Sequence, residues 1–423
     1  MGPVIYLAIG AALLLSIGIF KLSSSGIATS RAVNGLRKHR VSTLSAMRQA
    51  AEIARLNSEL KSGQSSSLDW RVMEVAEIVE ESQDCRSFYL VDPYRQPLPD
   101  FRPGQYLMVR PAIAGAYQTT RCYSLSSSPN QNYWRITVKR QEFDGSDDRK
   151  PQNGGLSKWM HRTIHEGDCL LIGGPNGEFY LPRESRTPLV LMAAGVGITP
   201  MASMLRWSLE KTPNRKVVLL YQVKDFDHWP LGKALHSWQR EYPNIEVITF
   251  CSRASEDDIG DMAGMTAGRF VKGKFDFTNA YKVLNDIEDC NYYMCGPDPW
   301  MQSIKDGLVS MGVDADRVHW ESFGGTGAQP KTVAAGDAEA VAVRFDNSEV
   351  DAEWSDPEQT LWELARESQV EIPSGCLSGV CGCCRVKLLK GKVEYDREIK
   401  IDLAENECLT CVTRPRGEVV LDA

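Results

Sequence analysis

The sequence predicts a multidomain protein with a single N-terminal transmembrane helix, an antiparallel β-barrel, an α/β domain and a small β-rich C-terminal domain. Three observations lead to this prediction. Residues 2–20 are apolar and uncharged, short β-type runs separated by Pro- and Gly-bearing turns begin at residue 70, and fully apolar strands followed by helical stretches begin at residue 189. A chain of 423 residues is long enough for two to four domains.

Residues 2–20 (GPVIYLAIGAALLLSIGIF) hold enough apolar residues to cross a bilayer as a helix, near the short end of the range. No Lys or Arg precedes them, whereas the following segment is basic: Lys21, Arg31, Arg37, Lys38, Arg40 and Arg48. Because a basic flank stays in the cytoplasm, we expect a single-pass protein of the inner (cytoplasmic) membrane with cytoplasmic domains. A cleaved signal peptide is the alternative, but it requires a positive n-region that this sequence lacks.

Residues 21–68 predict a tether between the membrane helix and the first folded domain. Residues 41–60 are rich in Ala, Glu, Arg and Leu, which favours a helix. Residues 61–67 (KSGQSSS) are typical of a flexible linker.

Composition excludes some classes of protein. The net charge of −7 argues against binding to nucleic acid. The 12 cysteines are sparse and uneven in a long chain, which favours a reducing compartment over a secreted disulfide scaffold.

Residues 69–186 predict the small antiparallel barrel, with expected strands at 70–79, 87–91, 106–110 and 134–139. A flavin needs a flat aromatic side chain to pack on, a hydroxyl or amide near the ring edge that gains a proton, and a cation for its phosphate. Arg121, Tyr123 and Ser124 can supply all three from one strand. Alone, these residues are equally compatible with an exposed strand that carries a surface arginine.

Two glycine-bearing segments follow in the same domain. In residues 154–161 (GGLSKWMH), glycines and a serine precede a predicted helix, and the amides at a helix start are a natural phosphate site. Residues 174–179 (GPNGEF) then close the domain. We expect His161 and His165 to have packing or capping roles.

Residues 187–325 predict a dinucleotide-binding α/β domain. An apolar strand at 189–193 and a helical stretch at 201–209 enclose a glycine turn, and further strands are expected at 216–222, 245–251 and 291–294. The turn carries the candidate ligand-binding residues Gly195, Gly197, Thr199 and Pro200. Its glycines allow the backbone to approach a pyrophosphate at the helix N-terminus.

After a Gly/Ala-rich linker (326–337), residues 338–423 carry the most informative motif. It consists of four cysteines, three in a C-x4-C-x2-C run and one further along: Cys376, Cys381, Cys384 and Cys411. Thiolates at these spacings converge on two irons, which is the plant-type ferredoxin pattern for a [2Fe–2S] cluster. Glycines in the loop permit the unusual backbone angles that such a loop requires. We therefore expect a β-grasp plant-type ferredoxin domain.

A zinc site is the alternative reading of these cysteines. Cys381 with Cys384, and Cys408 with Cys411, form two C-x2-C pairs across a spacer. Zinc would leave Cys376 and its glycine loop without a role. Cys383 and Cys408 break the ligand spacing, and we expect them to be packed as small hydrophobic residues.

The motifs, in this order, resemble the ferredoxin–NADP reductase superfamily over residues 70–423. The resemblance implies that Arg121, Tyr123 and Ser124 hold the flavin and its phosphate. It also implies that Gly155, Leu156 and Ser157 bind the phosphates. Cys295, Gly296 and Pro297 would then form the turn that meets the nicotinamide, here called the nicotinamide turn. It also implies that Phe323 stacks near the flavin with Glu321 close by. The domain order matches the phthalate dioxygenase reductase type, whereas sodium-pumping quinone reductase subunits place the ferredoxin first.

The cofactors follow from the same motifs. The glycine-proline turn at 174–179 favours FAD over FMN within the superfamily. A free ribose diol prefers an acid and a 2′-phosphate prefers a cation, and Asp225 lies beside Lys224, with Arg253 after the next strand. Asp225 lies nearest the usual ribose position, so we expect NADH, with NADPH as the alternative.

The expected function is a membrane-anchored reductase that oxidises NAD(P)H and passes single electrons through flavin and a [2Fe–2S] cluster. Its expected partner is an oxygenase, desaturase or hydroxylase. The expected contacts also include the lipid bilayer and a membrane-bound form of that acceptor. No catalytic acid–base group is expected, because the cofactors carry the chemistry. The alternative is a redox sensor or scaffold whose flavin and cluster report rather than turn over.

Overall fold

The computed structural model describes residues 70–111, 120–141, 155–266, 268–276, 289–323 and 340–423, except positions 371, 373, 376, 378, 380, 381, 398, 400 and 402. The described residues belong to one compact unit that spans residues 64–423. The expected membrane segment (2–20) and the whole of the expected tether (21–68) lie outside the described residues. Within the described ranges, no helix is long and apolar enough to cross a membrane.

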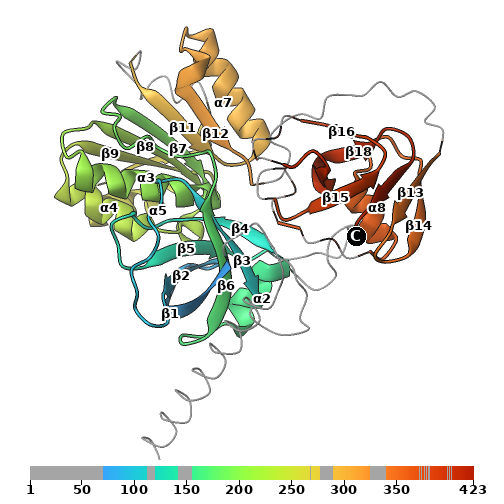
Figure 1. Cartoon of the computed structure of the whole chain (residues 1–423). Helices are drawn as coiled ribbons and strands as arrows, with labels where there is room; N and C mark the ends of the chain where they lie inside the picture. The colour runs from blue at the N-terminus through green and yellow to red at the C-terminus, as the bar shows by residue number, and fades with distance from the viewer. Residues whose placement is uncertain are drawn as a thin grey trace, which may run out of the picture. The chain divides into compact units, whose positions relative to one another are not determined.

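The first domain is a closed antiparallel barrel with the strand order β4-β3-β6-β1-β2-β5 (blue to green in Figure 1). Its strands are β1 (Trp70–Ser82), β2 (Cys85–Val91), β3 (Tyr106–Pro111), β4 (Arg121–Ser124), β5 (Trp134–Lys139) and β6 (Cys169–Asn176). A bridge between Leu125 and Ile136 joins the end of β4 to β5, which closes the sheet. Helix α2 (Gly155–Thr163) contributes Leu156 and Met160 to the barrel core.

Strand β1 extends three residues beyond the expected end at position 79, and β2 begins two residues early. The reason is a tight hairpin in which Ser82 pairs with Cys85, so that only Gln83 and Asp84 form the turn. This hairpin tip contacts the next domain, since the amide of Gln83 donates to the carbonyl oxygen of Asp227 at 2.9 Å.

The second domain is a parallel sheet with the strand order β10-β9-β8-β7-β11-β12. Its strands are β7 (Leu189–Ala194), β8 (Val217–Val223), β9 (Ile245–Cys251), β10 (Arg269–Lys272), β11 (Asn291–Cys295) and β12 (Val318–Glu321). Its helices are α3 (Ile198–Lys211), α4 (Gly232–Glu241), α5 (Glu256–Met265) and α7 (Asp298–Ser310). Helices α3, α4 and α5 cover one face and α7 covers the other, so strand residues are buried on both sides.

The strand order reverses at β7, which has β8 on one side and β11 on the other. Ligands of open α/β sheets bind beyond the carboxyl ends of the strands at such a point. The register pairs Ala193 of β7 with Cys295 of β11, so the glycine turn and the Cys295–Pro297 turn emerge side by side.

The third domain combines a mixed sheet of order β14-β13-β19-β15-β17 with a β16-β18 pair and one helix (red in Figure 1). Its elements are β13 (Val341–Phe345), β14 (Val350–Trp354), α8 (Leu361–Glu367), β15 (Arg385–Lys390), β16 (Val393–Tyr395), β17 (Glu407–Leu409), β18 (Thr413–Pro415) and β19 (Val419–Leu421). Helix α8 begins with a capping box between Thr360 and Glu363 and buries Leu361 and Leu364 in the core. The arrangement is that of the expected β-grasp domain.

Candidate functional site

Strand β4 presents the three residues expected to hold a flavin. It pairs with β3 so that Tyr123 lies opposite Leu107 and Ser124 opposite Tyr106. Strand alternation places Arg121 and Tyr123 on one face of β4 and Ser124 on the other. Burial raises the pKa of Tyr123, and the nearby Arg121 only partly offsets this, so the phenol stays neutral.

The start of α2 provides the predicted phosphate site of the barrel. Gly155 has φ of +61°, and a Cβ there would meet nothing within 4 Å. Leu156 anchors the helix in the barrel core, and Ser157 Oγ accepts a hydrogen bond from the amide of Gln141 at 3.3 Å. The first turn carries no acidic residue, so its amides present an uncompensated positive end to an anion.

His161, on the same helix, lies apart from this chemistry. It is buried, and its Nε2 lies 2.8 Å from the carbonyl oxygen of Val138. This contact is in keeping with the expected packing role.

The glycine turn of the second domain is braced from two directions. Gly195 has φ of +57°, whereas Gly197 has no space for a side chain, because a Cβ there would lie 2.1 Å from the carbonyl oxygen of Cys295. The buried Tyr221 hydroxyl donates to the carbonyl oxygen of Gly195 at 3.2 Å. Thr199 Oγ1 donates to the carbonyl oxygen of Val196 at 3.0 Å, and Pro200 lies in the buried first turn of α3.

Cys295 and Glu321 are register partners on the neighbouring strands β11 and β12. Cys295 is fully buried, and burial raises the pKa of its thiol well above the ordinary value, with Glu321 and Asp298 adding to the shift. The neutral thiol therefore suits packing against a ring rather than nucleophilic attack.

Glu321 and Ser124 form a buried polar pair beside Cys295. Burial raises the pKa of Glu321 to about 8, although the nearby Ser124 hydroxyl lowers it in part. Glu321 Oε2 and Ser124 Oγ are buried with no well-aligned hydrogen-bond partner among the described residues. Buried polar atoms normally have partners, so this pair fits the edge of a bound flavin and nicotinamide.

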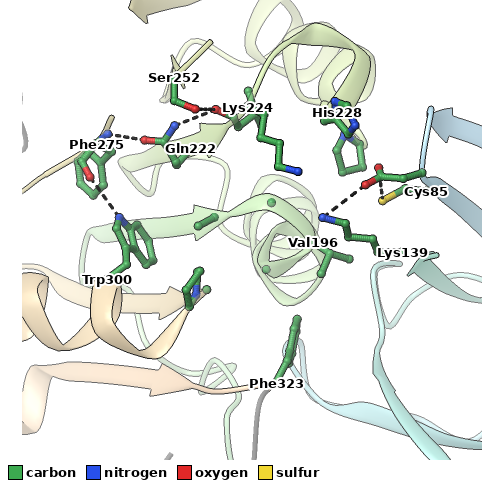
Figure 2. Close-up of a pocket in the computed structure, with 18 of the residues that line it drawn as sticks. Cys85, Lys139, Val196, Gln222, Lys224, His228, Ser252, Phe275, Trp300 and Phe323 are labelled. Carbon is green, nitrogen blue, oxygen red and sulfur yellow. Dashed lines mark hydrogen bonds and ion pairs between the residues drawn. The ribbon is translucent and has the colours of Figure 1, made fainter. Parts of the chain in front are cut away.

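A cleft of about 550 Å³ opens between the barrel and the carboxyl ends of the parallel strands (Figure 2). Its lining includes both turns of the second domain: Gly195, Val196, Gly197, Gly296 and Pro297. Phe323 lines the cleft with 48% of its surface exposed, so its ring is accessible to a ligand. The barrel contributes Asp84, Cys85, Lys139 and Gln141. A volume of this size suits a small-molecule ligand.

An aromatic wall closes one end of the cleft. Trp300 Nε1 donates to the carbonyl oxygen of Phe275 at 3.2 Å, which fixes the indole. Gln222 Nε2 donates to the carbonyl oxygens of Phe250 at 3.1 Å and of Val223 at 2.8 Å. These contacts give the nucleotide cleft a rigid rather than a flexible wall.

Asp225, on which the expectation of NADH depended, is engaged within the protein. Its carboxylate accepts from the amide of His228 at 3.0 Å and lies 2.6 Å from His228 Nδ1. Lys224, His228 and Ser252 line the cleft at this end, and Arg253 is exposed. The charges around the expected ribose position therefore remain mixed.

Two of the four predicted cluster ligands lie within the description. The Sγ atoms of Cys384 and Cys411 are 3.0 Å apart, and both residues are buried. The amide and the hydroxyl of Thr410 donate to the carbonyl oxygen of Cys384 at 3.1 and 3.0 Å, which ties the two segments together. Cys376 and Cys381 lie outside the described residues. The convergent thiols fit either the expected [2Fe–2S] cluster or another thiolate-bound metal.

The remaining features of the cysteine loop follow expectation. Gly379 and Gly382 have φ of +77° and +70°, as a loop that wraps a cluster requires. Cys408 is fully buried opposite Val386, and burial raises the pKa of its thiol to about 12. Cys383 is half-buried.

The functional candidates that sequence reasoning missed are Asp84, Lys139, Tyr221, Phe275 and Trp300. Lys139 and Tyr221 belong to strands that were expected, whereas Asp84, Phe275 and Trp300 lie outside the expected strands and helices. Trp300 has the nearest signal, since it lies three residues after Pro297 in the nicotinamide turn.

Comparisons with known proteins agree with this site. Three family models match: an oxidoreductase FAD-binding domain over residues 72–180, an oxidoreductase NAD-binding domain over 191–306 and a 2Fe-2S iron-sulfur cluster binding domain over 343–416. They support FAD, NADH and a [2Fe–2S] cluster as cofactors.

The relatives fall into two groups. A flavohemoprotein from Rhizobium meliloti (strain 1021) is 36% identical over 260 residues, which cover 60% of this chain and 60% of that protein. The glycine betaine monooxygenase reductase subunit from Chromohalobacter salexigens is 28% identical over 364 residues, with 82% and 93% covered. This chain therefore spans less than two thirds of the flavohemoprotein but most of the reductase subunit.

Among solved structures, phthalate dioxygenase reductase aligns with a TM-score of 0.54 and 26% sequence identity, covering 84% of this chain and 98% of that one. That structure is described as a modular structure for electron transfer from pyridine nucleotides to [2Fe–2S]. The chain therefore belongs to the ferredoxin–NADP reductase-like family whose members combine an FAD-binding, an NAD-binding and a [2Fe–2S] domain.

Proposed function

We propose that this protein oxidises NADH and delivers electrons one at a time to a partner oxygenase, desaturase or hydroxylase. One observation carries the proposal. Cys295, Glu321 and Ser124 meet where the barrel faces the carboxyl ends of β11 and β12, with two buried polar atoms that lack well-aligned partners among the described residues. Under this proposal, the flavin and the nicotinamide ring meet at this place.

The chain's own residues bind and orient, and do not transfer the electrons themselves. Arg121 and the amides at the start of α2 suit the flavin phosphates, and the glycine turn at 195–197 suits the pyrophosphate of the dinucleotide. Glu321 keeps its proton at neutral pH and so offers a hydrogen bond without adding charge. Bound FAD supplies two-electron acceptance and the cluster supplies one-electron export.

The oxygenase acceptor is proposed from two relatives. The printed names of the glycine betaine monooxygenase reductase subunit and of phthalate dioxygenase reductase connect those proteins to oxygenases. The alignments to these two proteins cover 82% and 84% of this chain. A net charge of −7 favours a partner with a basic docking face.

Steady-state assays of the holoenzyme test the proposed electron path. NADH should support reduction of ferricyanide, which the flavin alone can serve, and of cytochrome c, which needs one-electron delivery. Cys384→Ser should keep the first activity and lose most of the second, whereas the control Cys383→Ser should keep both. A protein with full FAD content that reduces neither acceptor with NADH would refute the proposal.

We also propose that residues 2–20 anchor the protein in the cytoplasmic membrane with its domains in the cytoplasm. The apolar run and its basic C-terminal flank support this proposal. Deletion of residues 1–67 should release a protein that keeps its cofactors and ferricyanide activity, but delivers electrons more slowly to a membrane-bound acceptor. If expression of the full-length gene gave a soluble protein that lacks its N-terminal segment, the segment would be a cleaved signal and the anchor would be contradicted.

A further inference from the structure

Strand pairing fixes a lysine of the barrel at the nucleotide cleft. Lys139 is the last residue of β5 and lies directly opposite Cys85, the first residue of β2. The amide of Arg140 donates to the carbonyl oxygen of Asp84 at 2.7 Å, which continues the ladder to the hairpin tip. Lys139 and Asp84 are therefore held side by side by backbone hydrogen bonds, and both line the cleft.

The two side chains form an ion pair in which Lys139 is the more exposed partner. Asp84 Oδ2 lies 3.4 Å from Lys139 Nζ, and the side chains are 17% and 37% exposed. Asp84 Oδ1 accepts from Ser82 Oγ at 3.1 Å and from Cys85 Sγ at 3.5 Å. The carboxylate is anchored by its neighbours, whereas the ammonium group is on a long and more exposed stem that can leave it.

The carboxylate is ionised in spite of its partial burial. Burial raises the pKa of Asp84, but Lys139, the contacts from Ser82 and Cys85, and His228 together bring it below its ordinary value. The cleft therefore holds a permanent negative charge next to its barrel lysine.

The position of this pair relates it to the dinucleotide. Lys139, Lys224 and Val196 of the glycine turn all line the same cleft, and Figure 2 shows the two lysine side chains reaching it from different elements. Under the proposed function, the pyrophosphate of NADH binds at this turn. The pyrophosphate therefore reaches a lysine that Asp84 has already neutralised.

We propose that Asp84 is a built-in counter-ion that competes with the dinucleotide pyrophosphate for Lys139. When the nucleotide is bound, Lys139 turns from the carboxylate toward the phosphate, and Asp84 remains as a like charge that repels it. The carboxylate thus weakens the binding of NADH and NAD⁺ and speeds product release. Asp84 acts through Lys139 and the local field, and does not touch the reacting atoms.

The variant Asp84→Asn tests this role, because the amide oxygen can still accept from Ser82 while the charge is lost. The Michaelis constant for NADH and the inhibition constant for NAD⁺ should fall about three- to tenfold in the ferricyanide assay, with kcat unchanged or lower. The dependence of both constants on salt should become steeper, because Lys139 is no longer neutralised. Lys139→Met should raise both constants.

The double variant Asp84→Asn/Lys139→Met should lose most of the single Asp84 effect, since the two groups act on one another. Asp100→Asn is the matched control, because Asp100 forms an ion pair with Arg183 at 2.6 Å in the barrel, with neither residue among those lining the cleft. It should leave both constants unchanged. FAD content and thermal unfolding of each variant establish that it is folded.

Two results would overturn the inference. A higher or unchanged Michaelis constant in folded Asp84→Asn would show that Asp84 positions Lys139 or is a bystander, and a neutral Lys139→Met would place the pyrophosphate elsewhere. If the wild-type holoenzyme does not oxidise NADH at all, the proposed function fails first and the inference falls with it. Should Asp84→Asn not fold, Asp84→Ser takes its place in the same assays with the same expected direction.

Discussion

The two helix starts at which we propose phosphate binding share one use of glycine and differ in a second. At the start of α2, Gly155 adopts φ of +61° in open space, and Gly195 before α3 does the same at +57°. Gly197 has no positive φ, but the carbonyl group of Cys295 occupies the place of a side chain. Glycine thus serves backbone conformation at the first two positions and close approach of two turns at the third.

Gly197→Ala should have the largest effect of the substitutions that separate these roles. The added methyl group would meet the backbone of Cys295, so the nicotinamide turn must move away from the start of α3. We expect a loss of about 1–3 kcal/mol in the free energy of unfolding, typical of overpacking, and loss of most NADH-dependent flavin reduction. Stopped-flow absorbance measures the reduction, and FAD content should be unchanged because the barrel is a separate domain.

Retention of fast reduction in Gly197→Ala would show that the two turns are not in contact in the working enzyme. Gly195→Ala is the matched variant in the same turn. It suffers only backbone strain, about 1–2 kcal/mol, and should keep more activity.

Arg121→Ala tests the barrel side of the comparison. Loss of a hydrogen bond to a charged group costs about 1.5–3 kcal/mol, so FAD should bind roughly 10- to 100-fold more weakly. Fluorescence titration of the flavin-free protein measures the change, and Arg95→Ala, which removes an exposed partner of Glu74, is the control. Chromatography of the released flavin identifies it, and recovery of FMN alone would contradict the assignment of FAD.

Glu321 of the α/β domain lies beside Ser124 of the barrel, and its carboxyl group leads us to expect that flavin reduction depends on pH. Burial raises its pKa to about 8 from an ordinary value of 4.5, so the neutral form dominates at pH 7. The rate of flavin reduction by NADH should fall severalfold as the pH rises through about 8, and Glu321→Gln should remove this inflection. An unchanged inflection in Glu321→Gln would assign it to another group.

The same shift has a consequence for stability. Because the folded-state pKa lies above the unfolded value, wild-type stability should decline relative to Glu321→Gln between pH 4.5 and pH 8. Thermal unfolding of both proteins at several pH values measures this difference. No divergence across this range would mean that Glu321 is solvated in the working protein.

Gly155→Ala should have the smallest effect. Open space around the position leaves only backbone strain, worth about 1–2 kcal/mol, and no clash with other residues. We expect at most a tenfold weaker binding of FAD. A complete loss of flavin would mean that the phosphate lies so close to Gly155 that the added methyl group displaces it.

The three-domain order could be predicted because each domain has a motif of its own. The continuous apolar run at 189–193 indicated a strand buried on both faces, and α3 and α7 cover those faces. The alternating apolar residues Val341, Val343 and Phe345 likewise form the first strand of the last domain, β13. Boundaries were less accurate, since the extension of β1 to Ser82 depends on pairing across the hairpin.

The residues that sequence reasoning missed owe their place to packing between distant segments. Asp84, in the turn before β2, and Lys139, at the end of β5, are 55 positions apart and become neighbours only through the pairing of β2 with β5. Tyr221 supports the glycine turn through its hydroxyl, but in the sequence it is one more residue of an apolar strand. Asp225 was visible, whereas its engagement by His228 was not.

The most direct test of the proposed electron path is anaerobic mixing of the holoenzyme with NADH, followed by flavin absorbance and by electron paramagnetic resonance of the cluster. In the wild type, the flavin bands should bleach first and the signal of the reduced [2Fe–2S] cluster should follow. In Cys384→Ser, the flavin should bleach at the wild-type rate with no cluster signal. Cluster reduction without prior flavin bleaching, or an intact cluster signal in Cys384→Ser, would contradict the account.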